Sequence, residues 1–179
     1  MTFSEVVNVV TTGGTPQLTL ETGSNDAVVN YTTGTGTNTL TFNYTVVEGH
    51  TSTDLNYVAT SSLALNSGTI KDAATNDATL TLPAIDNASS LAGNKALVID
   101  GVTPTITSVT STSNDGSYMI GDVVPVTVTF SEVVNVVTTG GTPTLTLETG
   151  SNDAAVSYTS GTGTLSLIHI SEPTRLATI

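Results

Sequence analysis

The chain has 179 residues, with fifteen Asp and Glu against three Lys and Arg, which gives a formal net charge of −12. Nucleic acids and anionic membrane surfaces bind clustered basic side chains, so this charge balance argues against both as partners. The sequence has no Cys, which excludes disulfides and thiolate metal sites, and no apolar run is long enough to insert into a bilayer.

Almost every segment of the chain has apolar residues at every second position. Leu40, Phe42, Tyr44 and Val46, for example, alternate with Thr and Asn. Because successive side chains of a strand point to opposite faces, each such segment places its apolar residues on one side of a sheet. We therefore predict strands at residues 3–10, 17–22, 27–33, 38–48, 55–60, 62–66, 78–83, 95–100, 105–111 and 123–130.

The segments between these strands carry the residues of tight turns, as in Gly13-Gly14-Thr15-Pro16. No segment of ten or more residues has a helical period. Short strands separated by such turns predict an all-β fold, namely an antiparallel Ig-like β-sandwich with Greek-key-like connections.

One long stretch of the sequence occurs twice. Residues 3–37 return as residues 130–164, at an offset of 127, and only four of the 35 aligned positions differ. A match of this length at a fixed spacing indicates a tandem array of one folded unit.

A period of 127 places about one and a half units in this chain. We expect residues 1–100 to be a unit that lacks its first strand or strands, and residues 101–164 to be the N-terminal part of a second copy. Pro104 suits the joint between them, since proline cannot donate a hydrogen bond to a strand ladder. The first unit is then expected to have an open sheet edge.

Four short motifs, taken together, resemble a known family, the bacterial Ig-like repeats of very large surface and biofilm adhesins. The resemblance covers about residues 1–164 and implies a secreted, non-catalytic spacer or adhesive module on the bacterial cell surface, within a much longer chain. The motifs are Ile-Lys-Asp-Ala-Ala (70–74), Val-Ile-Asp-Gly-Val-Thr-Pro (98–104), Val-Thr-Phe-Ser-Glu (128–132) and Pro-Thr-Leu-Thr-Leu (143–147).

The chain departs from that family at Thr75, where the family usually has Gly in an Asp-Ala-Ala-Gly-Asn turn. Glycine adopts positive φ angles without a steric penalty, and a β-branched residue does not. The threonine therefore argues against a positive-φ turn at this position.

Residues 165–179 do not follow the repeat. The first copy continues after Thr37 with Asn-Thr-Leu-Thr-Phe, whereas the second continues after Thr164 with Leu-Ser-Leu-Ile-His-Ile-Ser-Glu-Pro-Thr-Arg. That string, residues 165–175, resembles the translation of a transposase adapter used in short-read DNA libraries. We therefore expect residues 165–179 to be a non-native tail, and a genuine divergent terminus is the alternative.

Acidic side chains in turns are the candidate ligands for a metal ion. Calcium binds carboxylate and carbonyl oxygens from loops, and at the joints of an array it would stiffen the chain. Alternatively, these residues form Asx-turns and keep the surface acidic, and the chain has neither an EF-hand loop nor a Gly-Gly-x-Gly-x-Asp repeat. The candidates are Asp72, Asp77, Asp100, Asp115, Asp122 and Glu132.

No pattern in the sequence predicts catalysis. His50 stands in a polar turn, where we expect it to be solvated, and His169 falls in the divergent stretch. We therefore expect no enzyme but a spacer repeat of a secreted bacterial surface adhesin. Its partners are then the neighbouring repeats, with a cell-surface or polysaccharide ligand bound through other domains. The alternative is a ligand-binding module, for example for carbohydrate, attached to a secreted enzyme.

Overall fold

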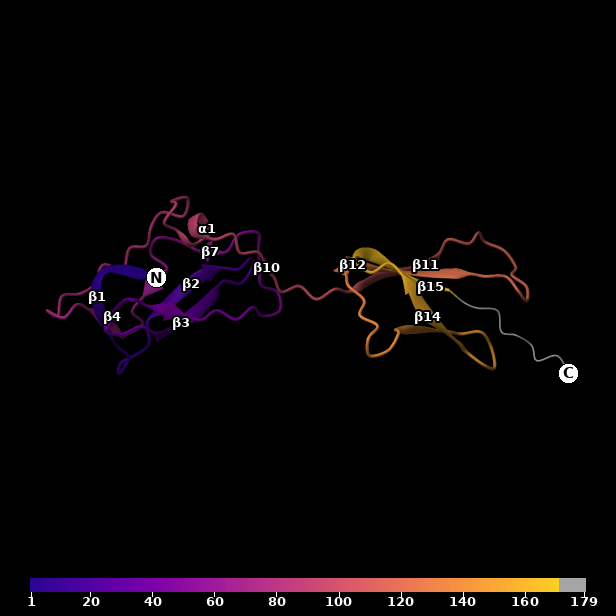
Figure 1. The fold of residues 1–179 in the computed structure, drawn as a ribbon, viewed down its shortest axis with the longest axis horizontal. Helices are drawn as coiled ribbons and strands as arrows, with labels where there is room; N and C mark the ends of the chain where they lie inside the picture. The colour runs from indigo at the N-terminus through magenta and orange to yellow at the C-terminus, as the bar shows by residue number, and fades with distance from the viewer. Residues whose placement is uncertain (171–179) are drawn as a thin grey trace. The chain divides into compact units, whose positions relative to one another are not determined.

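A computed structural model describes residues 1–170 of the chain. The chain divides into two compact units, the first from Met1 to Thr103 and the second beginning at Pro104 (Figure 1). This boundary falls three residues after the one expected between Asp100 and Gly101. Each unit is a curled half-barrel of antiparallel strands, which confirms the all-β prediction.

The first unit is organised around β1. The first half of β1 pairs with β4, and its second half pairs on the opposite edge with β9, which gives the strand order β4-β1-β9. A second sheet has the order β5-β3-β2-β7, with β8 also paired to β2, and β10 pairs with β6. The strands are β1 (Thr2–Val10), β2 (Gln17–Glu21), β3 (Ala27–Thr33), β4 (Thr37–Thr39), β5 (Thr41–Phe42), β6 (Thr51–Ser52), β7 (Asn56–Tyr57), β8 (Leu63–Ala64), β9 (Thr69–Lys71) and β10 (Ile99–Asp100), with one helical turn, α1 (Leu91–Asn94).

The second unit is a single five-stranded sheet with the order β11-β12-β15-β14-β13. β12 lies between β11 and β15 and is the counterpart of β1. The strands are β11 (Ile106–Ser111), β12 (Pro125–Val134), β13 (Thr144–Leu147), β14 (Ala154–Ser160) and β15 (Thr164–Ile170).

The two units pair their strands in the same register. Thr2 faces Thr39 in the first unit, and Thr129 faces Ser166 in the second, the same positions displaced by 127 residues. The bulge that follows in β1 recurs in β12, and the β2–β3 register recurs in β13–β14. The repeated sequence is therefore also a repeated structure.

The core of the first unit forms where the apolar residues of these strands meet. Leu40 and Ile70 are almost completely buried, at 0% and 1% exposed. They belong to a cluster of ten buried apolar side chains: Val7, Leu20, Ala27, Val29, Leu40, Leu55, Tyr57, Leu63, Ile70 and Leu82.

The strand predicted at residues 38–48 is wrong in its extent. The chain changes partner at Leu40, whose N–H donates to the Met1 carbonyl at 2.9 Å, so that β4 pairs with β1 and β5 pairs with β3. Residues 43–47 form no strand. Alternation of apolar residues continues through such a switch, and the pattern alone therefore did not reveal it.

The strand predicted at residues 78–83 is also absent from the described part of the chain. This segment turns its apolar residues inward, since Leu82 is buried and Leu80 packs against the core. However, only two of its backbone N–H groups find carbonyl partners, those of Ala78 with Ile70 and of Leu82 with Thr60. Of the strand predicted at residues 95–100, only β10 is present in the structure. The strands β6 and β9 were not predicted.

The turn at Thr75 corrects another expectation. Thr75 has a φ of 73°, in the left-handed region, although a β-branched residue is strained there. The turn is maintained by its neighbours, because the Thr75 N–H donates to the Asp72 carbonyl at 3.2 Å and the Asp72 N–H donates to the Asn76 carbonyl at 3.0 Å.

Residues 165–170 of the divergent stretch belong to β15 and occupy the places of residues 38–43 in the first unit. His169 stands at the position of Phe42, and each ring makes an edge-to-face contact with a tyrosine, at a centroid separation of 6.1 Å in both units. His169 is buried, and its Nδ1 has no hydrogen-bond partner in the described structure. The remainder of the stretch, residues 171–179, lies outside the described residues.

Candidate functional site

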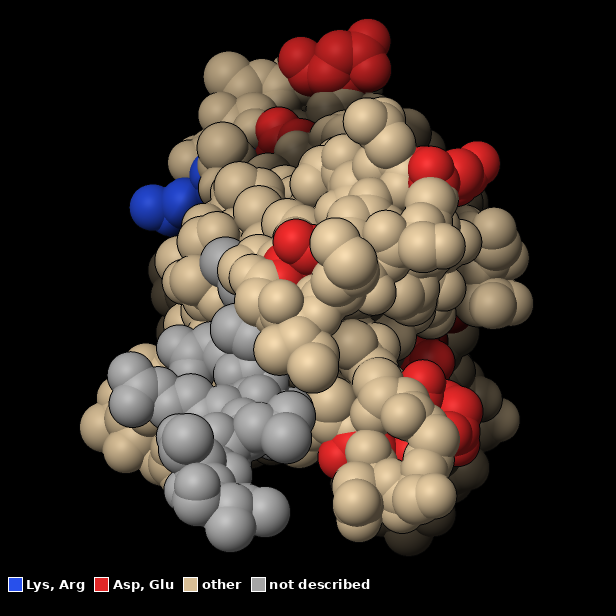
Figure 2. All heavy atoms as spheres, turned by 90° about the vertical axis from the view of Figure 1, so that its right-hand side faces the viewer, with Lys and Arg blue, Asp and Glu red and all other residues tan. Residues whose placement is uncertain are grey.

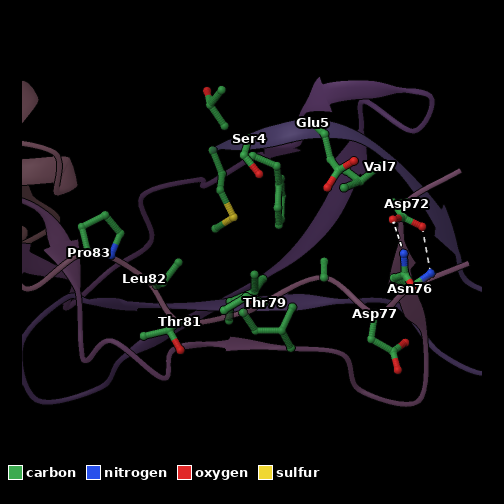
Figure 3. Close-up of a pocket in the computed structure, with 16 residues that line it drawn as sticks. Ser4, Glu5, Val7, Asp72, Asn76, Asp77, Thr79, Thr81, Leu82 and Pro83 are labelled. Atoms are coloured by element: carbon green, nitrogen blue, oxygen red, sulfur yellow. Dashed lines mark hydrogen bonds between the residues drawn. The ribbon is translucent and has the colours of Figure 1, made fainter. Parts of the chain in front are cut away.

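Two of the candidate calcium ligands lie in the turn that follows β9. Asp72 accepts hydrogen bonds from the Asn76 backbone N–H at 2.8 Å and from Asn76 Nδ2 at 2.7 Å (Figure 3). Asp77 forms a 2.5 Å ion pair with Lys71 Nζ instead. Both carboxylates therefore have protein partners, and in Figure 3 Asp77 points away from the Asp72–Asn76 pair.

The electrostatics of this turn follow from the same hydrogen bonds. The Asn76 side-chain and backbone donors lower the pKa of Asp72 below its ordinary value, with a smaller contribution from the nearby charge of Lys71. Asp72 is thereby held in its ionised form by neutral donors.

Asp100 and Asp122 close local turns. Asp100 Oδ1 accepts the Val102 N–H at 3.2 Å, and Asp122 Oδ2 accepts the Met119 N–H at 2.7 Å. These are the Asx-type contacts that short acidic side chains make with backbone a few residues away. Asp115 lies exposed in the turn between β11 and β12.

Glu132 differs from its counterpart in the first unit. Glu132 is half-buried in β12, and its Oε1 has no hydrogen-bond partner in the described structure. Glu5, at the same position of β1, is exposed and lines a groove. The equivalence of sequence position therefore does not extend to the environment of the two carboxylates.

Within residues 1–170, the structure contains no group of three or more Asp, Glu or His side chains placed to hold a metal ion together. Asp72 and Asp77 share one turn, but the other candidates lie in separate turns or strands. On the face drawn in Figure 2, acidic side chains are visible at several separate places.

A groove of about 420 Å³ runs between the first half of β1 and residues 78–83. Ser4 and Glu5 lie along one side, and Thr79 and Thr81 lie along the other (Figure 3). Phe3 and Leu80 also line the groove, so its wall is partly apolar. Sequence reasoning predicted an open sheet edge in this unit, although not which segment would face it.

A second groove contains an aromatic pair that sequence reasoning missed. Tyr44 Oη and His50 Nδ1 are joined by a 2.9 Å hydrogen bond, and the two rings stack at a centroid separation of 5.7 Å. Asn30 and Asn43 line the same groove. His50 is thus paired with a ring rather than simply solvated, and partial burial raises the pKa of Tyr44. The only sequence feature related to this pair is the six-residue spacing of Tyr44 and His50 across a turn, and that spacing alone does not predict a contact.

Comparison of the chain with family models, with curated proteins and with solved structures found no match. In the described residues, no helix has the length and apolar character needed to span a membrane.

Proposed function

We propose that this chain is a non-catalytic spacer repeat of a large secreted bacterial surface adhesin, with Ig-like sandwich units that act outside the cell. The observation that carries this proposal is the identical strand register at an offset of 127 residues. A unit that repeats both its sequence and its hydrogen-bond register adds the same length each time it occurs. Its immediate partners are then neighbouring repeats of the same chain.

The way the chain leaves the first unit supports this role. Gly101 N–H donates to the His50 carbonyl at 2.8 Å, and the Gly49 N–H donates to the Gly101 carbonyl at 2.8 Å. A Cβ at residue 101 would lie 2.3 Å from the Val47 carbonyl oxygen, so this close approach requires glycine. The chain thus leaves the first unit through a segment that is hydrogen-bonded to residues 49 and 50 and is followed by Pro104. Such an attachment is suited to transmitting tension from one unit to the next.

The experiment that tests the spacer proposal uses arrays of increasing copy number built from the complete 127-residue period. We expect the maximum dimension in small-angle X-ray scattering to rise linearly with copy number. A matched array with Gly101→Val in every copy should lose this linear increase. The valine side chain would collide with the Val47 carbonyl oxygen, so residue 101 could no longer form its hydrogen bonds where the chain leaves the unit. Arrays that collapse to a compact particle, whose dimension barely grows with copy number, would contradict the proposal.

The second candidate function is a carbohydrate-binding module attached to a secreted enzyme. The groove that holds the Tyr44–His50 pair, with Asn30 and Asn43, favours it, because sugars bind aromatic faces flanked by amide groups. Affinity electrophoresis in gels that contain soluble polysaccharides separates the two functions. A spacer migrates unretarded, whereas a module is retarded and loses this retardation in Tyr44→Ala but not in the control Tyr118→Ala.

A further inference from the structure

The last segment of the first unit, residues 84–101, forms a strap on its surface. The strap includes α1 and β10, and α1 lies beside β7 (Figure 1). It begins directly after Leu82, which belongs to the core, and Pro83, whose carbonyl accepts a hydrogen bond from the Tyr57 hydroxyl. The chain is thus fixed to the core at the point where the strap begins.

The strap contributes very little to the apolar core. None of the ten side chains in the core cluster belongs to it, and its one buried residue, Ser90, is polar. Ile85 and Val98 are 44% and 73% exposed, while Leu91 and Ile99 are only partly buried against the core. Because burial of apolar surface is the main favourable term in folding, detachment of the strap leaves most of that term intact.

Hydrogen bonds hold the end of the strap along one side only. The bonds of Gly101 to residues 49 and 50 are followed by the two-residue ladder between β10 and β6. Next, the Leu55 N–H donates to the Leu97 carbonyl at 2.8 Å, and the Leu97 N–H donates to Asp54 Oδ1 at 3.1 Å. Within the described residues β10 pairs with no strand but β6, so its other edge is open.

A buried amide group lies under the strap. Asn56 is 6% exposed, and its Nδ2 donates to the Ile85 carbonyl at 3.1 Å and to Ser90 Oγ at 3.5 Å. Ser90 Oγ also accepts the Gly93 N–H at 3.0 Å, at the start of α1. When the strap lifts, water replaces these partners, so the opening exposes polar groups that can be hydrated.

The segment beneath the strap has its own attachments to the unit. β7 pairs with β2, and the Thr51 N–H donates to the Thr22 carbonyl at 2.9 Å. Leu55 and Tyr57 belong to the core cluster. Residues 51–57 can therefore keep their place when the strap detaches.

From these observations we propose that the strap is an extensible element, which peels away from residues 49–57 under tension while the core of the unit stays folded. Load that reaches the unit through Thr103 acts first on the Gly101 hydrogen bonds and then on β10. Detachment stops at Pro83, where the chain enters the core.

The opening follows from the energetics of the fold. A segment with few buried apolar contacts opens at a lower free energy than the whole unit. The use of this opening under tension rests on the proposed spacer function. Each unit of a spacer would then gain length under load and recover its folded length when the load is removed.

The test pulls on the first unit of the full chain in an optical trap, with handles attached through azide-bearing residues introduced at positions 2 and 103. Fully extended, residues 84–101 span about 60 Å. We expect the unit to lengthen in two steps. The first is reversible and no longer than this span, and the core unfolds in the second.

Asp54→Ala should lower the force of the first step, because it removes the acceptor of the Leu97 N–H. Asp54 is exposed, so the force of the second step should stay unchanged. The matched control is Asp26→Ala, which removes an exposed carboxylate in the turn before β3 and should alter neither step.

A disulfide provides a second test, since the chain has no Cys of its own. Thr51 and Asp100 face each other in the ladder between β6 and β10, so Thr51→Cys combined with Asp100→Cys places two thiols across it. Oxidation should abolish the first step, and reduction of the same chain should restore it.

Three results would overturn the proposal. One is a parent chain whose first unit unfolds in a single step, because the strap and the core would then open together. Another is a first step whose force is the same in Asp54→Ala. The third is a first step that persists after oxidation, since another segment would then be the one that opens. None of these results changes the length of repeat arrays in scattering, so the strap and spacer proposals can fail separately.

Discussion

Thr75 is the clearest point of backbone strain in the first unit. Its φ of 73° places a β-branched side chain in the left-handed region, at a cost of about 1–2 kcal/mol. The hydrogen bonds between Asp72 and Asn76 hold the turn in this conformation regardless. The fold therefore does not depend on a β-branched residue at position 75, and a substitution there can remove the strain.

We predict that Thr75→Gly increases the free energy of unfolding by about 1 kcal/mol, since the relief of strain exceeds the added entropy of the unfolded chain. Urea unfolding followed by circular dichroism measures this change. The control is Ala74→Gly in the same turn, where φ is not positive and the substitution should destabilise the protein. A Thr75→Gly chain that is no more stable than the parent would contradict the prediction.

The second residue-scale prediction concerns Asp72, whose pKa is lowered by hydrogen bonds from Asn76. A lowered pKa in the folded state means that the ionised form stabilises the fold at neutral pH. This stabilisation begins to be lost as the pH falls to the unfolded-state pKa and disappears below the folded-state pKa. Asn76→Ala should therefore move the pKa of Asp72 upward, as measured by NMR titration of its carboxyl carbon. Asn87→Ala, in another turn, should leave that pKa in place.

At the scale of strands, β15 shows what the divergent stretch does to the repeat. Leu167 takes the buried position of Leu40 and satisfies the same apolar requirement, at 7% against 0% exposure. His169 takes the position of Phe42 and brings a buried Nδ1 that has no partner in the described structure. The alternation of apolar and polar side chains thus suffices to form the strand. At His169, however, a polar ring atom is buried where the first unit has the apolar ring of Phe42.

We predict that His169→Phe stabilises the second unit by about 1–3 kcal/mol, the usual cost of an unsatisfied buried polar atom. Hydrogen exchange of amides in β12 and β14, the neighbours of β15, reports the change locally. The reciprocal variant Phe42→His should destabilise the first unit. If His169→Phe left the exchange unaltered, the environment of this position would differ from that of Phe42.

The strands also show how far the sequence predicts this fold. Alternation placed β1, β2, β3 and β11 to within a residue or two, because each stays a single uninterrupted strand over the whole alternating segment. It failed at residues 38–48, where the chain changes partner at Leu40, and at residues 78–83, which are extended without a ladder. Period two reports which face is buried, and hydrogen-bond partners are a separate property.

The candidate sites were predicted less well than the strands. Spacing in the sequence brought Asp72 and Asp77 into one turn, and the structure places them there, but each has a protein partner. The Tyr44–His50 pair could not be predicted, because it depends on how residues 43–50 fold back after leaving β5. The groove beside β1 could be anticipated only as an open edge, since its other wall comes from residues far along the chain.

At the scale of the whole molecule, the two units have unequal cores. The first contains ten buried apolar side chains in one cluster. In the described residues of the second, only Val128, Val156 and Leu167 are buried apolar side chains. Burial of apolar surface is the main favourable term in folding, so the second unit has much less to offset the entropy of ordering its chain.

We therefore predict that the chain unfolds in two steps, with the second unit first, rather than in one cooperative transition. Hydrogen exchange with increasing urea should deprotect β12 and β14 well before their counterparts β1 and β3, although the sequences of each pair nearly match. The control is a chain in which Leu165–Ile179 is replaced by a copy of residues 38–100, which completes the second unit. Its β12 should then exchange at a urea concentration close to that of β1. A single transition in the parent chain would instead mean that the units share one folding equilibrium, and that burial within each unit does not set its stability.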